Sequence, residues 1–183
     1  SFAVANKEPN RNDFENGINT PENLNDYELG WRLKNESITL NTNVYYMLYK
    51  NQLVLTGAID NVGAPVRATS GKSYRLGVEI DADIKISNQF SVRSNIALSD
   101  NKNTDFVSSV NGGLIDLGNT DISFSPSVIA GNALVFNPLE NLQFSLLSKY
   151  VGKQYMSNLN STVSSNDVLE GYFTSDFNFT YIL

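Results

Sequence analysis

One segment of the sequence, residues 72–87 (KSYRLGVEIDADIKIS), alternates between apolar and polar side chains along its length. Successive side chains of a β-strand point to opposite faces, so this pattern predicts a strand with one apolar and one charged face. Strands of globular proteins are usually about five or six residues long. A tilted strand needs about 9–11 residues to cross a bilayer. The segment is therefore typical of a membrane-crossing strand.

The same alternation recurs along the chain and predicts about eight strands and no helix. The connections between these strands alternate between long and short, which is the layout of an outer-membrane barrel with its short turns in the periplasm. We therefore predict an all-β fold, an antiparallel up-and-down meander of about eight long strands that forms part of a transmembrane β-barrel. The predicted strands are residues 1–6, 26–34, 37–50, 72–87, 89–99, 119–136, 141–154 and 171–183. The predicted long loops are residues 7–25, 51–71, 100–118 and 157–167.

The pattern is weakest over residues 119–136, where Pro126 and Asn132 interrupt the apolar face. A β-bulge near Gly131 would explain this slip, because a bulge adds one unpaired residue to a strand. An error in the assignment of the two faces would explain it as well.

Charge and composition exclude several classes of function. The formal net charge is −6, which argues against a nucleic-acid partner because such proteins carry basic patches. The chain has no His and no Cys, which removes the Ser-His-Asp triad, thiolate chemistry and the commonest metal ligands. We expect no enzyme, no cofactor and no bound metal.

Alternation alone does not show which face points outward, because a soluble lipocalin-like barrel hides its apolar face inside. Three features favour an apolar face against lipid: the long strands, the mixed charges on the polar face, and aromatic residues near the strand ends. A complete eight-stranded barrel, either a small outer-membrane protein or a soluble ligand binder, is the alternative. The aromatic residues are Trp31, Phe90, Phe136 and Tyr181 near the short turns, and Tyr46, Tyr150 and Phe173 near the long loops.

Several segments together resemble the barrel of TonB-dependent receptors. Residues 23–30 (NLNDYELG) are similar to the family's E-x-L-x-x-Y-E-L-G strand, with Asn23 in place of the usual acidic residue. Asn61, Gly63, Gly77 and Glu79 are similar to its N-x-G and G-x-E segments. The resemblance implies a location in the outer membrane, contact with its lipid, and energy-coupled uptake of a scarce ligand such as a ferric siderophore, a cobalamin or a glycan.

Receptors of this kind have about 22 strands and a plugged lumen. We interpret residues 1–183 as a partial TonB-dependent receptor β-barrel, from the C-terminal half, without the plug domain and the last strands. Contact with TonB would then run through the absent plug region. A partial barrel has two open edges, and we expect these edges to close on each other or to pair with another copy.

Candidate ligand contacts lie in the loops and on the polar face. Arg11 and Asn12 in the first loop and Arg67 in the second are candidates for an anionic ligand, because Arg presents a forked set of donors. Tyr45 and Tyr49, with Met47 between them, are placed to stack on a ligand or a plug. Solvated loop charges and ordinary packing of the wall are the alternatives. Asp81 and Asp83 share one face, and we expect them to pair with neighbouring Arg or Lys residues.

Overall fold

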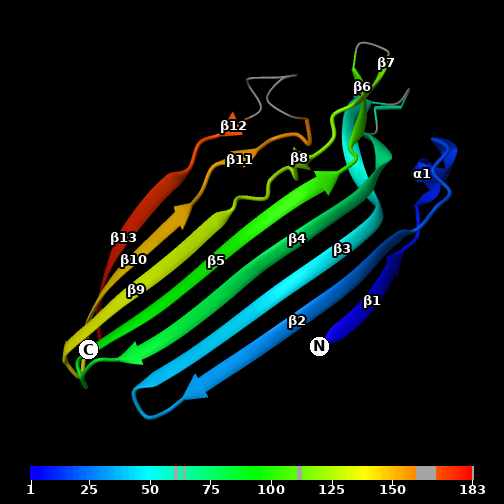
Figure 1. Cartoon of the computed structure of the whole chain (residues 1–183). Helices are drawn as coiled ribbons and strands as arrows, with labels where there is room; N and C mark the ends of the chain where they lie inside the picture. The colour runs from blue at the N-terminus through cyan, green and yellow to red at the C-terminus, as the bar shows by residue number, and fades with distance from the viewer. Residues whose placement is uncertain (60–61, 64, 111–112, 160–167, 183) are drawn as a thin grey trace.

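The computed structural model describes residues 1–59, 62–63, 65–110, 113–159 and 168–182. Within these residues one antiparallel sheet dominates, and its strands lie side by side as a tilted, curved wall (Figure 1). Tight turns gather at one end of the wall and longer connections at the other. The prediction of an all-β antiparallel meander with about eight long strands is confirmed.

The main path of the sheet is β1-β2-β3-β4-β5-β9-β10-β13, and the short strand β8 pairs with β5 beside this path. β1 and β13 are the two ends of the path, so the described residues form an open sheet, in contrast to the closed eight-stranded alternative. β6-β7 and β11-β12 are separate small hairpins. The bounds are β1 Phe2–Lys7, α1 Arg11–Glu15, β2 Glu22–Lys34, β3 Ile38–Ile59, β4 Pro65–Lys85, β5 Phe90–Thr104, β6 Val107–Val110, β7 Gly113–Asp116, β8 Thr120–Asp121, β9 Val128–Leu139, β10 Leu142–Val151, β11 Gln154–Tyr155, β12 Val168–Leu169 and β13 Tyr172–Tyr181.

The predicted loop over residues 51–71 is wrong over most of its length. β3 continues to Ile59 and β4 begins at Pro65, although the last residue of β3 that pairs with β2 is Lys50. The backbone groups of two adjacent strands satisfy each other, so a hairpin persists without an apolar face of its own. The glycines that favour a loop in the sequence therefore lie within a long hairpin.

The predicted strand over residues 119–136 is wrong in its first half. β9 begins only at Val128, after a turn, and the short β8 precedes that turn. The bulge expected near Gly131 is also wrong, because the pairing of β9 with β5 and β10 runs through Gly131 without a shift. The apolar pattern slips because residues 122–127 do not belong to a strand. Asn132 on the apolar face accepts a hydrogen bond from Ser94 Oγ at 2.9 Å.

Two further loop predictions change in the structure. The sequence does not predict the short helix α1, which Asn10 caps through a hydrogen bond from Asp13 N to Asn10 Oδ1. The loop expected over residues 100–118 contains the end of β5 and the β6-β7 hairpin. Residues 160–167, most of the fourth predicted loop, lie outside the described residues, and so does Asn61.

The apolar face of the sheet is exposed. Leu29, Trp31 and Phe177 are 75%, 57% and 67% accessible, and Leu76 is also exposed. Among the described residues, buried apolar side chains are few: Val54, Phe106, Ile122 and Val151. The described sheet is open and does not enclose its apolar face, in contrast to the alternative of a closed soluble barrel. No helix in the described part of the chain is long and apolar enough to span a membrane.

Aromatic residues gather near both ends of this exposed face, as predicted. Toward the tight turns, the ring centroids of Phe144 and Phe179 are 5.5 Å apart, and those of Phe136 and Phe144 are 6.4 Å apart. Toward the longer connections, the rings of Tyr46 and Tyr74 lie 6.2 Å apart. We call the part of this face between the two aromatic groups, which runs from Leu76 to Ile84 in β4, the apolar band.

Candidate functional site

The polar face of the sheet is hollowed where β2, β3, β4 and β5 meet. Strand register places Asp26 opposite Met47, Met47 opposite Arg75, and Arg75 opposite Asn101. All four side chains share one face, because directly opposite residues of antiparallel strands point to the same side. A groove of about 360 Å³ lies on this face and includes Met47, Arg75 and Asn101 in its lining.

Arg75 carries the most distinctive chemistry of this row. Its guanidinium carbon lies 5.6 Å from the centre of the Tyr49 ring, which is a cation–π distance. Its Nε is buried and has no hydrogen-bond partner among the described residues, and neither has the buried Oδ1 of Asp26. Buried polar atoms are normally paired, so the Nε of Arg75 and the Oδ1 of Asp26 stand out among the described residues as atoms without a partner. We call Asp26, Met47, Tyr49 and Arg75 the Arg75 cluster.

Tyr45 lies on the same face but is used by the wall itself. It stands opposite Gly77, and its ring occupies the space that a side chain at Gly77 would need. Glycine at this position therefore makes room for the tyrosine. Tyr45 also lines the groove beside Met47 and Glu79.

The loop candidates are held by ion pairs. Arg67 Nε lies 3.0 Å from Asp13 Oδ1, and the Asp13 side chain is only 3% exposed. We call this interaction, which ties α1 to β4, the loop clasp. Arg11 pairs with Glu15 one helical turn away, and its side chain is 92% exposed. Asn12 lies in the same helix and accepts a hydrogen bond from Asn16 Nδ2 through its backbone oxygen.

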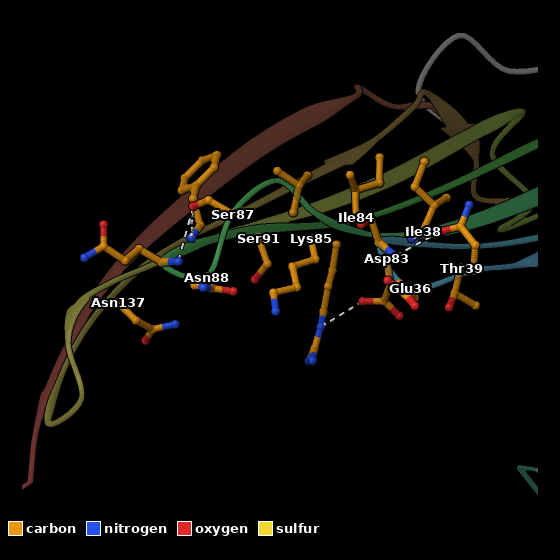
Figure 2. A pocket seen from close by; sticks show the side chains of 16 residues that line it. Glu36, Ile38, Thr39, Asp83, Ile84, Lys85, Ser87, Asn88, Ser91 and Asn137 are labelled. Atoms are coloured by element: carbon orange, nitrogen blue, oxygen red, sulfur yellow. Dashed lines mark hydrogen bonds and ion pairs between the residues drawn. The ribbon is translucent and has the colours of Figure 1, made fainter.

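A second groove, of about 330 Å³, lies at the end of the sheet with the tight turns (Figure 2). Figure 2 shows Ile38 and Ile84 on one side of the strands, and Lys85 and Ser91 on the other. Asp83 pairs with Arg93 here, at 2.9 Å, as predicted for this carboxylate. No ion pair of Asp81 is present among the described residues, so the pairing expected for it is not found.

The structure brings Tyr45 and Tyr49 together on one face and separates Arg11, Asn12 and Arg67 from them into the loop clasp region. Sequence reasoning assigned no ligand role to Arg75, Asp26 or Asp13. The alternation places Arg75 on the polar face, but its row depends on register. The register between strands of different hairpins cannot be predicted from a single sequence, because it depends on turn geometry and on pairing across the sheet.

Comparison with known proteins agrees with this architecture. A protein-family model described as "TonB dependent receptor-like, beta-barrel" matches residues 3–182. A search of curated proteins gives no match. Similar solved structures include the siderophore receptor PiuA from Acinetobacter baumannii, with 18% identity, a TM-score of 0.71 and coverage of 98% of this chain and 26% of that one.

Two further structures show the same fold. The copper transporter OprC has 14% identity and a TM-score of 0.71, with 98% of this chain and 27% of that chain covered. The ferric yersiniabactin uptake receptor FyuA from Yersinia pestis has 20% identity and a TM-score of 0.69, with 98% and 26% covered. The chain thus spans about a quarter of the length of these structures.

Proposed function

Because the chain belongs to the TonB-dependent receptor β-barrel family and so to the outer membrane, we propose that it forms part of the wall of a receptor that imports a small ligand with energy supplied through TonB. In this arrangement the apolar band faces lipid and the polar face lines the lumen. The Arg75 cluster is then a contact point on the path of the ligand.

The observation that carries this proposal is the unpaired Arg75. The guanidinium of Arg75 contacts the Tyr49 ring, and it forms no ion pair among the described residues. It therefore has N–H donors to spare. Hydrogen bonds to a charged group contribute about 1.5–3 kcal/mol. The terminal N–H groups of this guanidinium can donate to an anionic ligand, or to a carboxylate of a plug, and gain that contribution.

A ferric siderophore is the ligand class that we favour. Two of the similar structures are a siderophore receptor and a ferric yersiniabactin uptake receptor. The chemistry on the polar face suits a bulky polar anion, with an arginine, two tyrosines and a groove of about 360 Å³. Arg11, Asn12 and Arg67 at the entrance would meet the same ligand before the Arg75 cluster does.

The test is uptake of a panel of radiolabelled ferric siderophores by iron-limited cells that produce the full-length receptor. Arg75→Gln should weaken uptake of the ligand roughly tenfold or more at subsaturating concentration. Arg75→Lys should recover part of the loss, because the charge returns without the forked geometry. Arg32→Gln is the matched control, since Arg32 lies on the same face in a row nearer the tight turns.

Three outcomes separate the parts of the proposal. Equal uptake by Arg75→Gln and the parent receptor contradicts the role of the Arg75 cluster. Equal uptake in cells with and without TonB contradicts energy coupling. No uptake of any siderophore, combined with uptake of another small ligand in the same cells, contradicts the ligand class alone.

A further inference from the structure

A row of polar side chains crosses five strands on the apolar face of the sheet. It lies between the apolar band and the longer connections. Register pairs each member with the next across β1, β2, β3, β4 and β5. Each residue of the row lies an even number of positions from apolar residues of its own strand. Its side chain therefore points to the same face as the apolar band. We call these residues, Asn6, Asn23, Lys50, Lys72 and Thr104, the lysine row.

Two lysines stand directly opposite each other in this row. Lys50 of β3 pairs in register with Lys72 of β4, and both side chains are exposed. Like charges directly opposite each other destabilise a sheet. The row holds no acidic residue, and the ion pairs among the described residues involve other cations.

Two carboxylates on this face, Asp100 and Asp121, take part in other contacts. Asp100 accepts a hydrogen bond from Tyr74 Oη at 2.6 Å, and Asp121 pairs with Lys102. Among the described residues, neither carboxylate forms an ion pair with Lys50 or Lys72. Register places Asn23 beside Lys50 and Thr104 beside Lys72, and the side chains of Asn23 and Thr104 donate hydrogen bonds to the backbone oxygens of Pro21 and Lys72.

The row lies just beyond the aromatic residues that border the apolar band. Tyr74 and Leu48 occupy the next outward-facing positions in β4 and β3, and the apolar band begins beyond them. Tyrosine and tryptophan mark the level of the headgroups in membrane proteins. We propose that Lys50 and Lys72 bind the phosphate group of an anionic lipid headgroup in the adjacent leaflet.

This assignment is independent of the ligand that the receptor carries, because the lysine row lies on the opposite face of the sheet from the Arg75 cluster. A phosphate between two lysines removes their mutual repulsion and is held by two charges. Each lysine near an anionic membrane surface contributes about fivefold to binding, and two contribute about 30-fold.

The test uses the full-length receptor, purified in a non-ionic detergent and titrated with phosphatidylglycerol, phosphatidylcholine or inorganic phosphate. Native mass spectrometry counts the bound lipids. The double variant Lys50→Gln/Lys72→Gln should bind phosphatidylglycerol about 30-fold more weakly. The charge-matched control Lys34→Gln/Lys149→Gln removes two lysines from the polar face and should bind it as the parent does.

Preference for phosphatidylglycerol that disappears in Lys50→Gln/Lys72→Gln supports the proposal. Equal binding of phosphatidylglycerol and phosphatidylcholine, or equal losses in the two double variants, overturns it. Binding of inorganic phosphate without any preference for the lipid overturns the lipid source. If the glutamine variant does not fold, Lys50→Arg/Lys72→Arg must retain the preference, and salt must abolish it in the parent protein; failure of either overturns the proposal.

Discussion

Gly77 and Tyr45 form one unit at the scale of single residues. A Cβ added at Gly77 would meet the hydroxyl and ring of Tyr45 and would lie 2.8 Å from the backbone oxygen of Leu98. The ring therefore covers the glycine and supplies the packing that the glycine lacks. A tyrosine that packs on its own wall is less free to stack on a ligand, so we expect Tyr49 to contribute more to ligand contact than Tyr45.

Because the Tyr45 ring covers Gly77, even the addition of one methyl group at Gly77 should destabilise the protein. Gly77→Ala should lower the free energy of unfolding by about 1–3 kcal/mol, because the methyl group displaces Tyr45. Gly30→Ala is the control, since its added Cβ would meet its nearest atom at 3.8 Å, an ordinary contact. Urea unfolding in lipid vesicles measures both variants. A Gly77→Ala variant as stable as Gly30→Ala would mean that the ring moves away freely.

At the scale of elements, the loop clasp joins two segments that are far apart in sequence. Asp13 serves α1 and β4 together: its backbone N–H and a carboxylate oxygen bond to Asn10, and its other carboxylate oxygen meets Arg67. The side chain of Asp13 is almost fully buried and that of Arg67 is about three-quarters buried. A competing anion at Arg67 would therefore release α1 from the β3-β4 hairpin.

Breaking the clasp should loosen α1 without unfolding the sheet. Asp13→Asn removes one member of a buried pair, a change that typically costs about 3–5 kcal/mol, here confined to the loop. Glu15→Gln removes one member of the exposed pair with Arg11 and should cost about 0.3–0.5 kcal/mol. Hydrogen exchange of residues 10–16 measures both. Equal exchange in the two variants would show that the clasp contributes nothing to loop order.

At the scale of the whole molecule, we expect the apolar face of the curved sheet to meet lipid and the polar face to meet water. Ile80 lies within the apolar band and Asp81 on the polar face, one residue apart. Ile80→Arg should cost about 2–4 kcal/mol near the midplane, whereas Asp81→Arg should cost much less because its side chain stays in water. Folding into lipid vesicles, followed by heat-modifiable gel mobility, compares the two. Equal tolerance at both positions would contradict the orientation of the sheet.

The two edges of the sheet predict the behaviour of this chain when it is produced alone. β1 and β13 are exposed along their whole lengths and lie at opposite ends of the sheet. Unpaired strand edges are templates for further pairing. We expect the isolated 183-residue chain to associate in detergent, which light scattering measures. A stable monomer would show that the edges close on each other or are protected.

The amino-acid sequence by itself determined the fold class, the two faces of each strand and the position of the aromatic residues. These follow from alternation with a period of two, which is a local property of each strand. Only the tertiary structure decided where β3, β4 and β9 begin and end, which residues share a row, and that Arg67 meets Asp13. These features depend on pairing between strands, where backbone hydrogen bonds extend a hairpin past its apolar pattern and register brings distant residues together.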